Sequence, residues 1–585
     1  MHVKYLSKFS EVSSMRASRT HNAWRVSSQV GERSGTAMSS ERHRGAGNDI
    51  RTCEGCSPQP HVSHWTSMAM FQVLSSYTLI APFFLFVIIY SLGRRNSRRL
   101  PPGPYGFPLV GNVRETPFEH PEYTFASWAK KYGDLIYNEF FGHRTVIINS
   151  QKIAQELLEK RGAKYSSRPR MTMLAEMLGW NPTLTLLPYK AESRRKQRKW
   201  IHGTFGEKKS VQGFEGLKKR ETYIFVLGLM ETPDDYGLHV KRFLAALVLE
   251  SVYGHRITSL DDEYVTMMDS AMEATTTTGA AGGTLVDMLP FLKHMPAWMP
   301  GAGWKRAALR ARKLVWQGHH LPYRMAREAI ESGGAPPSLL STLMGDSTKT
   351  GQFEQEENDI IYTTGVIYAA ATDTTKAALL TFILAMTLHP EVGRKMQEEI
   401  DRVIGKHRLP TIEDRPDLPY VDSVLKETYR WHAPLPLGIP HYITEDDEYE
   451  GYQLPQDTTI MANMWAICRD ERVWNDPTAF RPERFLELDP SEAEALDPRH
   501  VVFGYGRRQC PGRLFADTAL FLVIATMAAT LDIRKARDAE GKEIIPEVSW
   551  LPAFISPPED FVCAIAPRSS SAKTSVADAL AGASA

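Results

Sequence analysis

The 585-residue chain has few cysteines and almost no net charge. Its five cysteines, at positions 53, 56, 468, 510 and 563, are too few and too scattered for a disulfide framework, so we expect a reducing compartment. Cys53 and Cys56 form a single CxxC with no second pair, and we assign no zinc site to them. The formal charge of +1 gives no global signal for a nucleic-acid partner. The composition argues against a disulfide-rich secreted scaffold and against a nucleic-acid-binding protein.

Charged residues are also missing from one long apolar stretch, residues 73–92. About twenty helical residues at 1.5 Å each match the ~30 Å hydrocarbon core of a bilayer. Four arginines follow between positions 94 and 99, whereas the nearest preceding Lys or Arg is Arg51. This asymmetry predicts a single-pass transmembrane anchor over residues 68–93, with the rest of the chain in the cytosol.

Composition divides the whole chain into five segments, one of which is this anchor. Residues 1–67 are polar and predicted to be a disordered extension, and we hypothesise that translation starts at Met68 or Met70. The anchor is followed by a basic, proline-rich hinge over residues 94–104. Residues 105–566 have no strong linker and predict one large domain, and residues 567–585 are rich in Ser and Ala and predict a disordered tail. Helical periodicity dominates the domain and β-branched runs are short, which predicts a mainly α fold with a minor β region.

A glycine-rich loop surrounds Cys510. Its characteristic residues are Phe503, Gly504, Gly506, Arg508, Cys510 and Gly512. Glycines permit a tight backbone close to a sulfur ligand, and guanidinium groups can bind the carboxylate of a haem propionate. A cysteine thiolate on haem iron favours cleavage of the O–O bond, which is chemistry for oxidising a substrate. The alternative is an inert buried cysteine in a turn.

A second unusual pattern lies in the middle of an apolar helix predicted from Asp359 to His389. Residues 370–375 read AATDTT, which places small side chains, an acid and hydroxyls at its centre. An acid beside a hydroxyl, here Asp373 and Thr374, can relay protons to a reacting oxygen. Two alternatives remain, a second membrane span and ordinary polar residues at a helix bend.

The loop spacing Phe-x-x-Gly-x-Arg-x-Cys-x-Gly resembles the cysteine-ligand loop of the cytochrome P450 monooxygenases, in particular microsomal-type members of fungal secondary metabolism. Residues 370–375 are similar to the oxygen-binding helix of that family, although Ala371 stands where glycine is usual. The resemblance implies the cytochrome P450 fold, with Cys510 as axial ligand of haem b and Asp373 and Thr374 as proton donors.

The same resemblance implies roles for residues outside the two motifs. Arg198, His441 and Arg508 would bind the haem propionates, although Arg194 stands where the family has Trp. The Glu-x-x-Arg and Pro-Glu-Arg-Phe elements are similar to family elements that form a buried structural network, here of Glu427, Arg430 and Arg484. Residues 550–555 lie where the family lines its substrate pocket, and core packing explains them equally well.

The implied function is insertion of one oxygen atom from O2 into an apolar small molecule, such as a terpenoid, polyketide or aromatic metabolite. Electrons would come from NADPH through NADPH-cytochrome P450 reductase, at the endoplasmic reticulum membrane. Trp298 and Trp304 would contact the bilayer. Two alternatives are a haem-thiolate isomerase or dehydratase that needs no reductase, and a non-catalytic membrane scaffold with a degenerate haem site.

Overall fold

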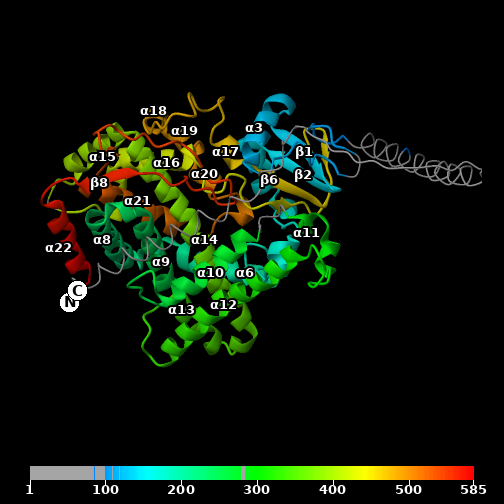
Figure 1. The fold of residues 1–585 in the computed structure, drawn as a ribbon, viewed down its shortest axis with the longest axis horizontal. Helices are drawn as coiled ribbons and strands as arrows, with labels where there is room; N and C mark the ends of the chain where they lie inside the picture. Colours follow the sequence, from blue (N-terminus) through cyan, green and yellow to red (C-terminus); the bar gives the residue numbers. More distant parts are fainter. Residues whose placement is uncertain are drawn as a thin grey trace, which may run out of the picture. The chain divides into compact units, whose positions relative to one another are not determined.

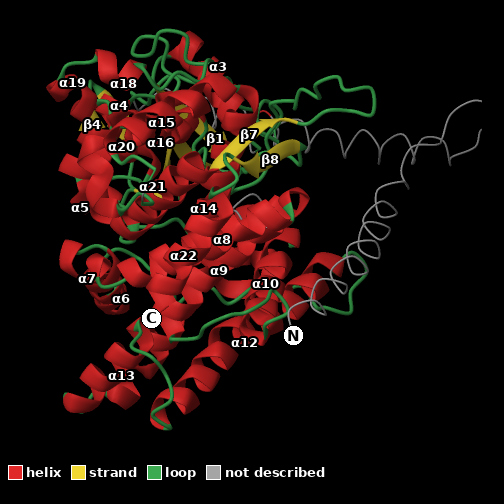
Figure 2. Cartoon of the chain, turned by 90° about the vertical axis from the view of Figure 1, so that its left-hand side faces the viewer, coloured by secondary structure: helices red, strands yellow, loops and turns green. Residues whose placement is uncertain are grey.

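The computed structural model describes Leu85 and residues 99–107, 110–117, 119–278, 284–406 and 408–584. Apart from Leu85, the predicted N-terminal extension and transmembrane anchor lie outside the described residues. The described chain is mainly helical with three small sheets, which confirms the mainly α fold with a minor β region (Figures 1 and 2).

The longest described helix is α14 (Phe353–Leu388), whose 36 residues extend about 54 Å at 1.5 Å per residue. Glu354 and Glu356 lie in its first turn, where their negative charges interact favourably with the positive end of the helix dipole. Pro390, which lacks a backbone N–H, begins the next helix, α15 (Pro390–Val403). The second half of α14 is almost entirely buried, so this helix forms the centre of the core.

The other helices surround α14 (Figure 2). The long ones are α3 (Pro121–Tyr132), α6 (Glu192–Phe205), α8 (Glu215–Glu231), α9 (Tyr236–Tyr253), α10 (Glu263–Thr277), α12 (Gly303–Glu331), α13 (Leu339–Lys349), α16 (Pro419–Trp431), α21 (Arg513–Thr530) and α22 (Ala572–Ser584). The short ones are α4 (Gln151–Ala154), α5 (Gly162–Tyr165), α7 (Lys208–Gln212), α11 (Leu285–Met288), α17 (Met464–Ile467), α18 (Arg484–Glu487), α19 (Pro490–Ala495) and α20 (Arg499–Val502). The largest apolar cluster joins α8, α9, α14, α15, α16 and α21. Burial of each large aliphatic or aromatic side chain there contributes ~1.5–3 kcal/mol.

The main sheet has the strand order β1-β2-β6-β3. Its strands are β1 (Leu135–Phe140), β2 (His143–Ile148), β6 (Thr458–Ala462) and β3 (His441–Tyr442). A two-residue turn joins β1 to β2, and Phe141 and Gly142 both have the positive φ that such a turn requires. β6 then pairs in parallel with β2 and antiparallel with β3, which places His441 at the sheet edge. The two remaining sheets are hairpins of β4 (Asp447–Tyr449) with β5 (Tyr452–Leu454), and of β7 (Leu531–Lys535) with β8 (Cys563–Pro567).

Among the described helices, only α21 is long and apolar enough to cross a membrane. In the structure 72% of its apolar window is buried inside the protein. Its position therefore suits a core helix.

The C-terminal tail differs from the sequence expectation. Residues 567–585 were expected to be disordered, but residues 572–584 form α22, which packs against α8. Val576 is fully buried, and Ala579, Leu580 and Ala583 pack against the same core. These four residues lie on one helix face, because their spacing follows the helical repeat. The prediction of a disordered tail is wrong for α22, since it relied on the Ser- and Ala-rich composition and overlooked this apolar stripe.

Candidate active site

The cysteine loop runs from α20 to α21 and is closed by backbone hydrogen bonds. The Cys510 N–H donates to the Phe503 carbonyl at 2.8 Å, and the Gln509 N–H donates to the Gly506 carbonyl at 3.1 Å. Gly504 and Gly506 have positive φ values of 76° and 51°. A Cβ on Gly506 would lie 2.4 Å from the Leu158 carbonyl oxygen, so this position requires glycine.

Gly512 differs from the other two glycines. Its φ is −95°, which any residue can adopt, and a Cβ there would meet no atom within 4 Å. The open space on this side of the loop leaves room for a bound group.

The Cys510 thiol is accessible to solvent although many protein atoms surround it. This crowding raises the pKa of the Cys510 thiol, whereas the Gly512 N–H, Arg198 and Arg513 lower it. In the middle of α14, Ala370 is also exposed although most of its neighbours in sequence are buried or half-buried. Open space of this kind inside a core indicates room for a ligand.

Four arginines and a histidine lie on the cysteine loop or on segments next to it, namely Arg168, Arg194, Arg198, Arg508 and His441. Arg198 on α6 donates to the Gln509 carbonyl at 2.9 Å, so it lies beside the cysteine loop. Arg508 donates to the carbonyls of Ser166, Leu184 and Leu187 at 2.7, 3.0 and 2.6 Å. His441 donates through Nδ1 to the Tyr165 carbonyl at 2.9 Å. The structure therefore brings the three predicted propionate ligands to neighbouring segments.

Sequence reasoning missed Arg168 and treated Arg194 as a departure from the family pattern. Arg168 donates to the carbonyls of Ile439 and Pro440 at 2.9 and 2.7 Å, next to His441. Arg194 is buried and donates to the Tyr189 carbonyl at 2.7 Å. No sequence signal singled out Arg168, because only the folded chain brings it beside His441.

We call Arg168, Arg194, Arg198, Arg508 and His441 the basic group. Within the described part of the chain, none of its arginines forms an ion pair with a carboxylate. Burial, together with Arg168, Arg194 and Arg198, lowers the pKa of Arg508 to about 8. Uncompensated buried cations are costly unless an anion joins them. The basic group therefore fits a ligand with two carboxylates, as haem has.

Asp373 and Thr374 follow each other on α14 and face different surroundings. The Thr374 hydroxyl donates to the Ala370 carbonyl at 2.7 Å. Asp373 lines a cavity of ≈ 310 Å³ between α9, α10 and α14, together with Lys241, Asp269 and Tyr368. Burial and the nearby Asp269 raise the pKa of Asp373, although Lys376 and Lys241 oppose this. The acid can therefore hold a proton more readily than an exposed aspartate.

Ala371, the departure from the family pattern, packs its methyl group against a core cluster that includes Tyr253 and Phe205. The additional methyl group thus has a packing partner in the core.

Glu427, Arg430 and Arg484 lie together in a buried network. Arg430 contacts both carboxylate oxygens of Glu427 at 2.7 and 2.9 Å, and Arg484 donates to Oε1 at 3.1 Å. The Arg481 N–H donates to the same oxygen at 2.7 Å. The arginines also donate to backbone carbonyls of residues 468–479, so this network ties α16 to the segment before α18.

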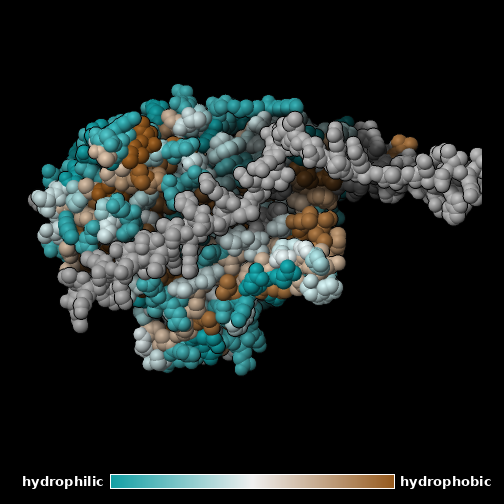
Figure 3. Space-filling view, viewed as in Figure 1, coloured by the Kyte–Doolittle hydropathy of each residue, from teal (hydrophilic) through white to brown (hydrophobic). Residues whose placement is uncertain are grey.

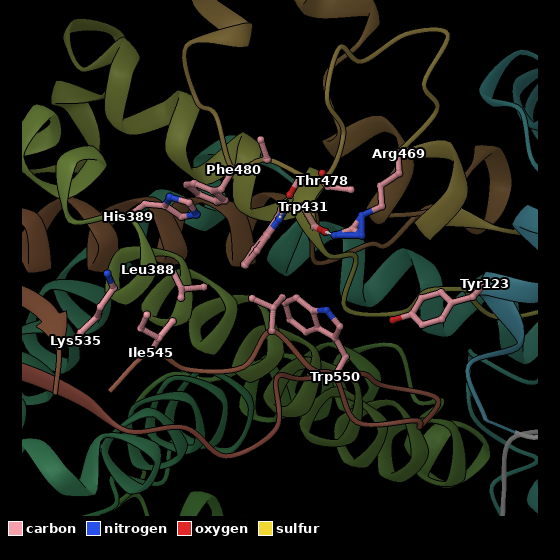
Figure 4. Close-up of a pocket in the computed structure, with 12 residues that line it drawn as sticks. Tyr123, Leu388, His389, Trp431, Arg469, Thr478, Phe480, Lys535, Ile545 and Trp550 are labelled. Carbon is pink, nitrogen blue, oxygen red and sulfur yellow. Dashed lines mark hydrogen bonds between the residues drawn. The ribbon is translucent and has the colours of Figure 1, made fainter. Parts of the chain in front are cut away.

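A separate cleft of ≈ 570 Å³ opens at the C-terminal end of α14 (Figure 4). Its lining includes Trp431, Phe480 and Trp550. The Trp550 ring stacks on His432 at a centroid distance of 3.6 Å and meets Trp431 edge-on at 5.5 Å. Trp550, which the sequence left open between substrate pocket and core, therefore packs in an aromatic cluster.

Comparison with known proteins identifies the family to which this architecture belongs. Residues 101–560 match the sequence pattern of the cytochrome P450 family. The chain is 40% identical over 490 residues to cytochrome P450 monooxygenase 176 of Postia placenta, covering 84% of this chain and 94% of that protein. It is 36% identical over 496 residues to cytochrome P450 monooxygenase COX2 of Coprinopsis cinerea, covering 84% and 94%. It is 37% identical over 492 residues to cytochrome P450 monooxygenase claR of Ampulloclitocybe clavipes, covering 83% and 90%.

Proposed function

This chain belongs to the cytochrome P450 family and is a P450 monooxygenase, and from that premise we propose that Cys510 is the thiolate that binds the haem iron. The observation that carries the proposal is the accessible Cys510 thiol in a loop shaped by Gly504 and Gly506. When bound, haem supplies the redox chemistry that activates O2, and the thiolate favours O–O cleavage.

The basic group supports haem b as the form of the cofactor. Haem b carries two propionates, and the basic group offers cations that the described residues do not neutralise. Arg198, His441 and Arg508 would hold these carboxylates, with Arg168 and Arg194 adding positive charge. Hydrogen bonds from these arginines to backbone carbonyls would orient the guanidinium groups before the cofactor binds.

Asp373 and Thr374 would supply protons to the reacting oxygen. Lys241 and Asp269, which line the cavity beside Asp373, have side chains 39% and 31% exposed, so water can reach this cavity from outside. A proton would pass from that water to Asp373 and then, through an ordered water, to the Thr374 hydroxyl.

NADPH-cytochrome P450 reductase is proposed as the electron donor. Four cations on and next to α6, namely Arg195, Lys199, Lys208 and Lys209, are exposed and form no ion pair among the described residues. A basic surface next to the cysteine loop favours docking of an acidic partner protein. Binding to the reductase should therefore weaken as salt concentration rises, and salt-independent binding would contradict this docking mode.

A membrane location at the endoplasmic reticulum and an apolar substrate are proposed together. Leu285, Phe291, Trp298 and Met299 are 57%, 65%, 80% and 42% exposed, and Figure 3 shows apolar surface around α11. Trp304 instead packs against the core, so only Trp298 of the two tryptophans suits contact with lipid. We expect Trp298→Glu to weaken vesicle binding of a chain that lacks residues 1–93, and unchanged binding would contradict a lipid contact. Terpenoid, polyketide and aromatic metabolites are the proposed substrate classes.

The deciding experiment compares the wild-type chain with Cys510→Ser. We expect the reduced wild-type protein to give the carbon monoxide band of a thiolate-ligated haem and Cys510→Ser to lose it. Reductase-supplemented membranes with NADPH should add one oxygen atom to a metabolite, measured as a mass gain. Asp373→Asn should keep the band and lose ~10²-fold or more in turnover. A band that survives in Cys510→Ser would disprove the ligand assignment, and turnover without NADPH would indicate an isomerase or dehydratase.

A further inference from the structure

Six charged side chains form a cluster at the two ends of the cysteine loop, outside the site described above. We call it the charge cluster, and it consists of Arg415, Asp422, Lys426, Asp497, Arg499 and Asp517. Their side chains are between 3% and 20% exposed. Three cations face three carboxylates, so the charges balance inside the protein, unlike those of the basic group.

Asp517 on α21 is the meeting point of the charge cluster. Its Oδ2 lies 2.7 Å from Arg415 Nη1 and 3.4 Å from Arg499 Nη1. Arg415 also contacts Asp422 Oδ1 at 2.5 Å, and Arg499 lies 3.5 Å from the same oxygen. Two arginines therefore join one carboxylate on α21 to one on α16.

This arrangement closes the base of the cysteine loop. Arg499 begins α20, before the loop, and Asp517 lies in α21, after it. The two residues are 18 positions apart in sequence, and Cys510 lies between them. An ion pair across the ends of a loop restricts the conformations of the residues inside it.

A second connection runs from the charge cluster to the backbone of Cys510. The Tyr429 hydroxyl lies 3.4 Å from Asp517 Oδ1, and the Tyr429 ring meets Phe503 edge-on at 5.5 Å. The Phe503 carbonyl accepts the hydrogen bond from the Cys510 N–H. Displacement of Asp517 would therefore reach Cys510 through packed side chains.

The charges in this cluster depend on one another. Burial alone would raise the pKa of Asp422, but Arg415, Arg499 and Lys426 hold that pKa below its ordinary value. Removal of one member would leave an uncompensated buried charge and allow its neighbours to move.

We propose that the charge cluster positions Cys510, so that its thiolate stays on the haem iron instead of converting to the protonated, weakly bound thiol. The inference rests on the proposed role of Cys510. Arg499 and Asp517 would be positioning residues, because their ion pair joins the two ends of the loop and would act on the cofactor through Cys510.

The test uses full-length holoprotein with Asp517→Asn, which keeps side-chain volume and removes the charge. The matched control is Glu250→Gln, which removes a carboxylate from an ion pair with Arg220 between α9 and α8. For each protein, the rate at which the thiolate-type carbon monoxide band converts to the thiol-type band is measured under mild heating. The midpoint of thermal unfolding is measured separately by circular dichroism.

We expect Asp517→Asn to convert about tenfold faster than wild type, which corresponds to ~1.4 kcal/mol. Glu250→Gln should lower the unfolding midpoint and leave the conversion rate unchanged. If Asp517→Asn does not fold, Arg499→Lys and Arg499→Gln replace it, and Lys should preserve more of the thiolate band because it keeps the cation.

Equal conversion rates in wild type and in the charge-cluster variants would overturn the proposal. The charge cluster would then contribute to the stability of the fold without positioning Cys510. A wild-type protein without any thiolate band would instead refute the proposed function.

Discussion

Arg430 is fully buried and Arg508 is half-buried, and their charges have different partners. Arg430 contacts both oxygens of Glu427 and shares that carboxylate with Arg484. Among the described residues, Arg508 donates only to three backbone carbonyls, and its neighbours Arg168, Arg194 and Arg198 add further positive charge. The arginines around Glu427 are thus compensated by a carboxylate, whereas no carboxylate among the described residues pairs with the arginines of the basic group.

Under the proposed function, this difference separates residues that stabilise the fold from residues that bind the cofactor. Buried cations are retained in the network because a carboxylate compensates them. In the basic group, backbone carbonyls orient the guanidinium groups but supply no negative charge. Mutations in the two regions should therefore affect different measurements.

The largest effect is expected for Glu427→Gln. The substitution leaves Arg430 and Arg484 buried without a carboxylate, which typically costs ~3–5 kcal/mol. We expect a large loss in the free energy of unfolding, measured with urea, even without haem. The control is Glu487→Gln, because the ion pair of Glu487 with Arg481 is exposed and worth ~1 kcal/mol or less. Similar losses of unfolding free energy in the two variants would contradict the conclusion that the buried network stabilises the fold more than an exposed ion pair does.

The network and the cysteine loop were accessible to prediction because their residues lie in short, specific motifs. Glu427 and Arg430 are one helical turn apart, and residues 503–512 form one continuous loop. The helix predicted from Asp359 to His389 corresponds to α14, which begins six residues earlier at Phe353. The six additional residues make tertiary contacts that the local sequence does not reveal, such as the ion pair of Lys196 with Glu356 and the contact of the Arg327 guanidinium with the Phe353 ring.

The basic group was only partly predictable, because its five members come from four separate segments, with Arg194 and Arg198 both on α6. Arg168 follows the short helix α5 and forms no ion pair with any described residue, so nothing in its local sequence marks it. Arg194 was judged by the family pattern, in which Trp occupies this position, and its guanidinium group instead lies over the Tyr189 ring at 4.7 Å. The charge cluster was missed because its ion pairs join residues up to 102 positions apart.

An intermediate effect is expected for Arg508→Gln. The loss of one charge-assisted hydrogen bond to a propionate costs ~1.5–3 kcal/mol, or about ten- to a hundredfold in haem affinity. The unfolding free energy of the haem-free protein should fall less than in Glu427→Gln, because repulsion among the remaining arginines is relieved. A haem titration followed by absorbance checks the affinity. Unchanged affinity with a large loss of stability would place Arg508 among the fold-holding residues.

The smallest effect at neutral pH concerns His441, because this effect develops only as the pH falls. Burial, with Arg168 and Arg508 nearby, lowers the pKa of His441 to about 3, whereas an unfolded histidine titrates near its ordinary value of 6.5. His441 therefore contributes its full stability above about pH 6.5, and this contribution is lost as pH falls toward 3, because the unfolded chain binds the proton first.

In haem-free His441→Gln, the fall in unfolding free energy over this window should be shallower by at most ~1.4 kcal/mol per pH unit. His319 and His432 also have lowered pKa values but are present in both proteins, so the difference isolates His441. Bound haem should shrink this difference, because propionates beside His441 favour its protonated form. Urea unfolding at several pH values, with and without haem, measures both slopes. A difference that persists with haem bound would mean that the propionates lie elsewhere and that the basic group serves another anion.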